Sequence, residues 1–180
     1  MLNWLTTLGA MVESMPIAIW IVLPPALVLA LRARRGRIVS RLGQWLQPAW
    51  LGLLSWIVGR DANTLSPGVA FAAGGALVAG IAAGFLLAFP ARVGADHQWG
   101  LLRIGGSVLP LAAVLATFAA TLVVHAGIGA PRVLMASLVA MAFAVGLVTG
   151  RVLGHDLKAR RTEHVDLMAP GKTGRFLSRL

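Results

Sequence analysis

The stretch VAFAAGGALVAGIAAGFLLAF, residues 69 to 89, contains no polar side chain. Such a run is longer than a core strand and matches the roughly 20 residues that a helix needs to cross the hydrocarbon core of a bilayer. Stepping by four residues from Ala72 to Ala88 gives a small residue each time, and Gly80 and Gly84 form a GxxxG motif within this row. Small residues at this spacing let a neighbouring helix approach closely. The stretch therefore predicts a membrane-spanning helix, over residues 68–89, that packs against another helix.

Four further apolar runs accompany it. The last of them contains Gly146 and Gly150 in the same four-residue register, which predicts a second small-residue packing face. The first contains Pro24 and Pro25, which are expected to kink or interrupt it because each lacks an amide donor. The predicted spans are residues 15–31, 42–58, 104–124 and 133–153.

The second span is the least apolar, because it carries Gln44, Gln47 and Ser55. Polar side chains at membrane depth are expected to face protein or water rather than lipid. Together with the helix-breaking prolines, these three residues indicate a polar path through the bundle as one possibility.

Composition supports a membrane protein and argues against a soluble nucleic-acid-binding domain. The chain has 180 residues, of which 58% are hydrophobic and 12% charged, whereas a soluble domain is about half apolar and a quarter charged. The net charge of +10 arises because only 6 acidic residues balance 16 basic ones. There is no cysteine, which excludes disulfides, thiolate metal sites and cysteine nucleophiles.

The basic residues divide unequally between the two sides of a five-span bundle. Only Arg60 and Arg132 fall on one side, and the other fourteen lie in the loops after the first and third spans, at the end of the last span, or in the tail. By the positive-inside rule this predicts an amino terminus outside and a cytoplasmic carboxyl terminus.

The densest basic segment is LRARRGRIVSR, residues 31–41. We interpret its arginines as determinants of topology that contact anionic lipid headgroups, in preference to a nucleic acid, because the chain offers them no aromatic platform or folded reading domain. These arginines are Arg32, Arg34, Arg35, Arg37 and Arg41.

The sequence thus predicts an all-α, polytopic membrane bundle of about five transmembrane helices. Residues 1–14 have apolar positions at helical spacing and predict a short helix in the membrane interface. Residues 15–154 form the predicted transmembrane domain, and residues 155–180 a basic cytoplasmic tail.

Several segments resemble an uncharacterised family of small multi-pass bacterial inner-membrane proteins, known only as a domain of unknown function. The resemblance rests on Arg92 followed by IGGSVLPLAAVLATF (104–118), on MPIAIW (15–20) with the basic LRARRGR after it, and on GLVTGRVL (146–153). It implies a bacterial inner-membrane location and about five helices, and it carries no known activity or site.

Two groups of residues are candidate sites. Gly105, Gly106 and Ser107 are interpreted as a turn and helix cap at the start of the fourth span, with an anion held there by Arg103 and Arg92 as the alternative. His125 is interpreted as an interfacial residue. The histidines and acids of the tail do not predict a metal site, because the tail offers no rigid scaffold; they are His155, Asp156, His164 and Asp166. No catalytic, cofactor or metal residue is assigned.

The function predicted from these features is a non-enzymatic structural or interaction role, with the lipid bilayer, a second copy or another membrane protein as partner. The alternative is a small permease or transporter subunit, and an enzyme acting on lipid ranks third. A cavity on which Gln44, Gln47 and Ser55 converge would favour the permease.

Overall fold

The computed structural model describes residues 16–61, 66–125, 131–165 and 167. This part of the chain is mostly helical, as predicted. Its helices are α2 (Ile17–Ala33), α3 (Leu46–Asp61), α4 (Pro67–Ala88), α5 (Leu109–His125) and α6 (Pro131–Arg161), and a 3₁₀ turn, η1 (Gly43–Trp45), precedes α3. The predicted interfacial helix at residues 1–14 lies outside the described residues.

Two helices, α4 and α6, are long and apolar enough to cross a membrane, judged by length and composition. Helix α2 continues without interruption through Pro24 and Pro25. Helix α6 continues beyond residue 153, where the last span was predicted to end, as far as Arg161.

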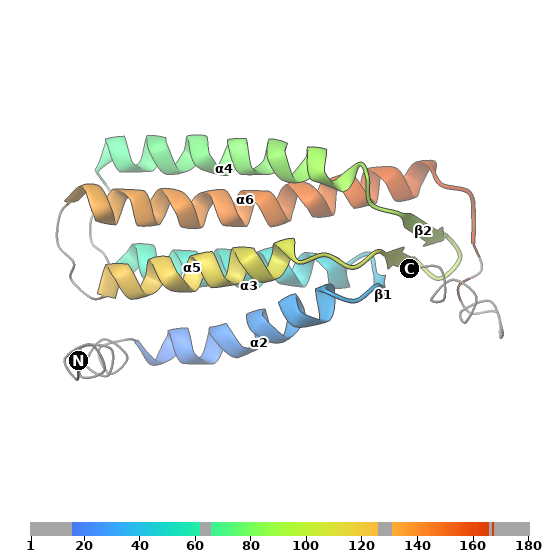
Figure 1. Ribbon diagram of the computed structural model, residues 1–180, viewed down its shortest axis with the longest axis horizontal. Helices are drawn as coiled ribbons and strands as arrows, with labels where there is room; N and C mark the ends of the chain where they lie inside the picture. The colour runs from blue at the N-terminus through green and yellow to red at the C-terminus, as the bar shows by residue number, and fades with distance from the viewer. Residues whose placement is uncertain (1–15, 62–65, 126–130, 166, 168–180) are drawn as a thin grey trace.

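The helices run back and forth along one long axis, and α6 lies between α4 and the group of α2, α3 and α5 (Figure 1). The core of that group consists of apolar side chains from all of its helices and from α6, such as Ile19 of α2, Leu54 of α3 and Met141 of α6. Helix α4 lies outside this core and packs almost entirely against α6.

The contact between α4 and α6 is built on the glycines that were predicted to pack helices: Gly80 and Gly84 on α4, and Gly146 and Gly150 on α6. A Cβ atom added at Gly84 would lie 2.7 Å from the carbonyl carbon of Leu147 and would overlap its oxygen. One added at Gly150 would lie 2.7 Å from the carbonyl carbon of Ile81 and would overlap that oxygen in the same way. The two backbones are therefore in direct contact, and the small-residue faces join two helices of the same chain.

A small antiparallel sheet, which the all-α prediction did not include, closes one end of the bundle. Its strands are β1 (Arg37–Ser40), β2 (Val93–Asp96) and β3 (Leu101–Ile104), in the order β1-β3-β2. Strands β2 and β3 form a hairpin in which Gly100 has a φ of 61°. Strand β1 joins them from the connection between α2 and α3, with Arg37 opposite Ile104 and Ser40 opposite Leu101. Segments assigned to loops by sequence are thus paired with each other. The predicted start of the fourth span at residue 104 is wrong, because Ile104 belongs to β3 and α5 begins at Leu109.

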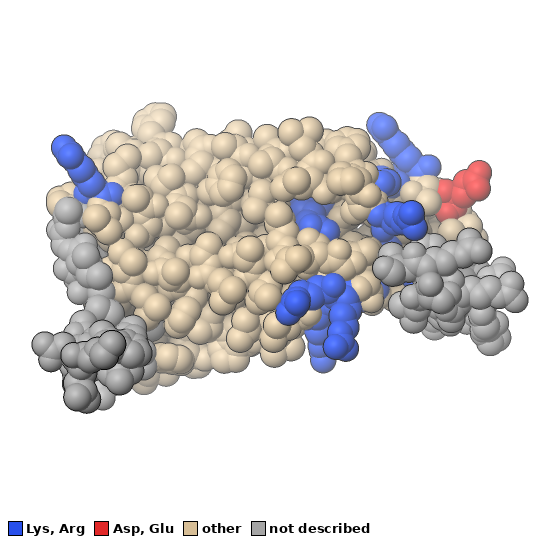
Figure 2. Space-filling view, viewed as in Figure 1, with Lys and Arg blue, Asp and Glu red and all other residues tan. Residues whose placement is uncertain are grey.

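Basic side chains concentrate at the end of the bundle that carries the sheet, here called the sheet end (Figure 2). Arg60 and Arg132 lie at the opposite end, on the last turn of α3 and at the start of α6. The described basic residues of the sheet end are Arg32, Arg34, Arg35, Arg37, Arg41, Arg92, Arg103, Arg151, Lys158, Arg160 and Arg161.

Candidate functional site

A partly open cavity of about 40 Å³ lies where the helices meet the sheet, and we call it the junction cavity. It is bounded by α2, β1, η1, α3, β3, the start of α5 and the sheet-end part of α6. Its polar lining consists of Arg37, Gln44, Gln47, Ser107, Arg151 and His155. Among the described residues that line it there is no carboxylate.

The local structure explains why these side chains converge. Gln44 and Gln47 are three residues apart across η1 and the first turn of α3, so they lie on one face. Arg151 and His155 are four residues apart on α6 and share a face in the same way. Arg37 enters from the first position of β1.

Three of the lining side chains are almost completely buried and carry polar atoms without a hydrogen-bond partner among the described residues. Gln44 is 3% exposed, Gln47 5% and His155 3%. The unpartnered atoms are both amide atoms of Gln44, Nε2 of Gln47 and Nε2 of His155. An unpaired buried polar group costs about 1–3 kcal/mol, so such atoms at a cavity point to a bound water or ligand.

Ser107, predicted as the helix cap, lies one residue before the cap position of α5, since the carbonyl oxygen of Val108 accepts from the amide of Ala112 (3.0 Å), but it still bonds the first amide of the helix. Its Oγ accepts a hydrogen bond from the amide of Leu109 (3.2 Å), and its own amide donates to the carbonyl oxygen of Ala33 (2.8 Å). Arg151 Nη1 also donates to Ser107 Oγ. Gly106 allows this turn to pack closely, because a Cβ atom there would lie 3.0 Å from the carbonyl carbon of Arg34 and would overlap its oxygen.

The arginines that line the cavity beside this turn are not those expected for the alternative of an anion site. Arg103 lies within β3, opposite Gly94, and the carbonyl oxygen of Arg92 accepts from the amide of Gly105 (3.2 Å). The residues lining the cavity beside Ser107 include Arg151 and Arg37 instead. The sequence pattern that could have identified the α6 side chains is Arg151-x-x-x-His155, two polar residues one turn apart at the end of an apolar helix.

The predicted polar path does not form one continuous cavity. Ser55 lines a different cavity of about 460 Å³, near the opposite end, between α3, α4 and α6. The lining there is largely apolar and includes Trp56, Leu138 and Met141. Gln44 and Gln47 are brought together with Pro110, and Ser55 is separated from them.

The arginines of residues 32–41 occupy three environments. Arg32, Arg34 and Arg35 line an exposed surface hollow beside Leu31. Arg41 Nε lies 3.5 Å from Asp156 Oδ1. Arg37 is partly buried at the junction cavity, and this burial, followed by the charge of Arg32, lowers the pKa of its guanidinium, which still remains protonated at neutral pH.

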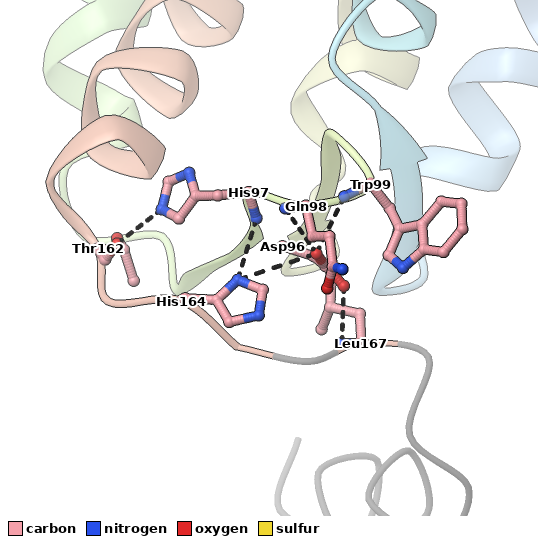
Figure 3. A network of polar contacts seen from close by, with 7 residues as sticks. All are labelled: Asp96, His97, Gln98, Trp99, Thr162, His164 and Leu167. Atoms are coloured by element: carbon pink, nitrogen blue, oxygen red, sulfur yellow. Dashed lines mark hydrogen bonds and ion pairs between the residues drawn. The ribbon is translucent and has the colours of Figure 1, made fainter.

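A second polar cluster holds the segment after α6 against the β2–β3 hairpin (Figure 3). Asp96, 2% exposed, accepts hydrogen bonds from the amides of Gln98 (3.1 Å) and Trp99 (3.2 Å) with Oδ1, and from the amide of Leu167 (3.2 Å) with Oδ2. His164 Nδ1 lies 3.9 Å from Asp96 Oδ1. Burial acts to raise the pKa of Asp96, but these amides and His164 outweigh it and hold the pKa below its ordinary value.

The histidines of this cluster bind backbone groups. Nδ1 of His164 accepts from the amide of His97 (3.2 Å), and Nε2 of His97 lies 3.0 Å from the carbonyl oxygen of Thr162. Val165 donates its amide to the carbonyl oxygen of Ala95 (2.9 Å). Within the described ranges, no three His, Asp or Glu side chains are grouped so that they could hold a metal ion.

The other residues considered from sequence lie apart from both clusters. His125, at the end of α5, has Nδ1 3.0 Å from the carbonyl oxygen of Thr121 in its own helix. Asp156 pairs with Arg160 Nη2 (2.9 Å) as well as with Arg41. Asp166 lies outside the described residues.

Comparison with known proteins identifies no matching family, no matching characterised protein and no matching solved structure. The chemistry of the junction cavity therefore has to be interpreted from its own residues.

Proposed function

We propose that this chain is a multi-pass bacterial inner-membrane protein of five spans, with a non-enzymatic structural or interaction role. The observation that carries the proposal is the exposure of α4, one of the two long apolar helices. In the most apolar 18 residues of α4, the mean hydropathy is 2.1, yet only 11% of the residues are buried in the protein. A core helix of a soluble domain would bury such a surface, whereas lipid covers it at no cost.

Helix lengths support the same arrangement. At 1.5 Å per residue, α2 and α5, with 17 residues each, extend about 26 Å, and α4, with 22 residues, about 33 Å, close to the roughly 30 Å of a hydrocarbon core. Helix α6, with 31 residues, extends about 46 Å. The part of α6 that exceeds the thickness of the hydrocarbon core lies at the sheet end. There the helix carries Arg151, Lys158 and Arg160.

The distribution of charge supports the orientation. The sheet end contains all but two of the described basic residues, so the positive-inside rule favours a cytoplasmic sheet end and an external amino terminus. The resemblance to small inner-membrane proteins agrees with this location but remains a prediction.

Cysteine labelling tests the topology, since the natural chain has no cysteine. Thr64→Cys lies between α3 and α4, and Gln98→Cys lies in the exposed turn of the β2–β3 hairpin. In spheroplasts, a membrane-impermeant maleimide is expected to label the Thr64→Cys variant directly and the Gln98→Cys variant only after permeabilisation. The reverse pattern contradicts the orientation, and direct labelling of both variants contradicts five spans.

Photo-crosslinking in native membranes tests the interaction role. The outward side of α4 carries exposed large side chains, including Phe71 (84% exposed), Val78 (66%) and Leu86 (66%). A photoreactive residue at position 78 is expected to trap a protein, either a second copy or another membrane protein. A residue placed at the buried position Leu54 is the matched control. Capture of lipid alone from position 78 argues against the role.

A permease is the second candidate, because Gln44, Gln47 and Pro110 meet at one cavity. The separate position of Ser55 and the small volume of about 40 Å³ disfavour it, since cavities for small-molecule ligands are usually about 300–1,000 Å³. Chloride flux into proteoliposomes tests whether the chain transports small anions. It is measured with a halide-sensitive dye for the natural chain and for Gln47→Leu. Flux that depends on Gln47 supports the permease.

A further inference from the structure

The junction cavity has an excess of positive charge. Arg37 and Arg151 line it, and the described lining includes no acidic residue. The nearby carboxylate of Asp156 is directed to Arg41 and Arg160 instead. Both guanidinium groups are partly buried with no carboxylate in the described lining, and a charge removed from water without a counter-ion is unfavourable, so an anion that enters stabilises this arrangement.

The cavity also contains hydrogen-bond donors that have no partner among the described residues. Nε2 of Gln44 and Nε2 of Gln47 are N–H donors, and Nε2 of His155 is a donor in one tautomer; none of them has a partner among the described residues. Each of these side chains is more than nine-tenths buried at the cavity. Unpaired donors beside two guanidinium groups are suited to an oxygen-rich anion. The remaining acceptor, Gln44 Oε1, is free to accept from a water or a hydroxyl group.

The arrangement of the donors and the volume of the cavity limit which kind of anion can bind there. The donors come from three directions, since Arg37 lies on β1, the glutamines on η1 and α3, and Arg151 with His155 on α6. Donors placed around a centre suit a tetrahedral group better than a planar carboxylate, which a single guanidinium already pairs with in one plane. The partly open volume of about 40 Å³ restricts the ligand to a small group and excludes a nucleotide.

We propose that the junction cavity binds a single phosphoryl group, supplied either by an anionic lipid headgroup or by inorganic phosphate. The lipid source rests on the proposed membrane location, whereas the inorganic source does not depend on it. Ser107, whose Oγ accepts from Arg151 and from the first amide of α5, forms the adjoining wall.

Inorganic phosphate is tested first, with the purified full-length chain in an uncharged detergent. Phosphate near 100 times its dissociation constant is expected to raise the unfolding temperature by about 5–10 °C over chloride at equal ionic strength. Gln44→Leu removes the unpaired amide without leaving a hole and is expected to reduce this increase by about half, as for an affinity weakened about tenfold. Ser55→Ala is the matched control, because Ser55 Oγ is also buried and unpartnered but lines the other cavity, and it should keep the increase.

The lipid source is tested in nanodiscs. Phosphatidylglycerol mixed into phosphatidylcholine is expected to remain bound in native mass spectrometry of the natural chain. Arg151→Gln is expected to weaken retention about 10- to 100-fold, as for loss of a charged hydrogen bond. Arg35→Gln is the control for contact with exposed arginines and should change retention little.

The outcomes separate the sources. A response to phosphate that Gln44→Leu reduces and Ser55→Ala does not assigns the site to the free anion. Phosphatidylglycerol retention that depends on Arg151, without a phosphate response, assigns it to a headgroup. If neither probe binds, or if Gln44→Leu and Arg151→Gln respond like the natural chain, the cavity holds only water and the proposal is overturned. If a variant fails to fold, NMR of the natural chain decides instead whether the cavity binds a probe. The chemical shifts of the His155 ring are followed while each probe is added. Failure of the topology test leaves the phosphate result unaffected.

Discussion

At the scale of single residues, the glycines between α4 and α6 differ sharply from glycines elsewhere on the same helix. A Cβ atom at Gly84 would enter the backbone of Leu147, whereas one at Gly75 would meet nothing within 4 Å. Identical residues on one helix therefore have different roles, and only the neighbouring helix distinguishes them.

Gly84→Ala is accordingly expected to destabilise the protein by about 1–3 kcal/mol or more, because the two backbones must separate. Gly75→Ala is the matched control and should be neutral or slightly stabilising, since alanine loses less backbone entropy than glycine in a helix. Thermal unfolding in detergent, followed by circular dichroism, measures both. Equal unfolding temperatures for the two variants contradict the direct backbone contact.

Asp96 is one of the residues that join the segment after α6 to the hairpin, and its pKa predicts a pH dependence. Its folded pKa lies below the ordinary value of 3.8, so its contribution to stability is complete above about pH 5 and is lost as the pH falls through the folded pKa. The difference in unfolding free energy between the natural chain and Asp96→Asn should be largest near pH 6 and shrink below pH 3.8. A difference that stays constant from about pH 6 to about pH 3 contradicts this assignment.

At the scale of elements, the extension of α6 beyond the apolar segment stabilises the end of α4. Lys158 Nζ donates to the carbonyl oxygens of Phe89 (2.8 Å) and Ala91 (2.5 Å), which follow the last turn of α4. A cation there satisfies free carbonyl groups and interacts favourably with the negative end of the helix dipole. The polar residues after 153 are thus partly a structural extension of the bundle.

Lys158→Met is expected to remove about 1 kcal/mol from the local stability of the α4 terminus. Hydrogen exchange of amides in the last turn of α4 should become about fivefold faster. Arg161→Met, on the same helix and exposed, is the control and should leave that exchange unchanged. Equal exchange in both variants means that Lys158 does not hold this terminus.

The sheet shows why short elements escape prediction from sequence. Its strands have four residues each, so alternation of apolar and polar side chains repeats too few times to indicate a strand. The hairpin turn is made by Asp96, accepting from two following amides, and by Gly100, and this combination resembles an ordinary loop in sequence. Strand β1 forms only because the connection between α4 and α5 lies beside it in space.

At the scale of the whole molecule, one end is basic and the middle is apolar. Residues 31–41, the β2–β3 hairpin and the last turns of α6 all meet at the sheet end (Figure 1). Basic side chains from segments distant in sequence therefore lie close together there (Figure 2). If this end stays in the cytoplasm because of its charge, the orientation depends on the number of arginines present.

Replacing Arg32, Arg34, Arg35, Arg37 and Arg41 together by glutamine is therefore expected to produce a substantial inverted population. In those molecules the Gln98→Cys position becomes accessible to impermeant maleimide without permeabilisation. The matched control replaces Arg60 and Arg132, at the opposite end, by glutamine and should keep the hairpin protected. Unchanged labelling after the fivefold replacement counts against the arginines as determinants of topology.

The sequence by itself determined that the chain is mostly helical and apolar and that glycines at four-residue spacing form packing faces, because these features depend on local composition and period. It did not show that the glycine faces join α4 to α6, that Gln44 and Gln47 are separated from Ser55, or that Arg151 takes the place expected for Arg103. Those relations depend on which helices become neighbours and on how α6 is rotated about its axis. Only the tertiary structure decides this, since helix packing is set by long-range contacts that no local pattern contains.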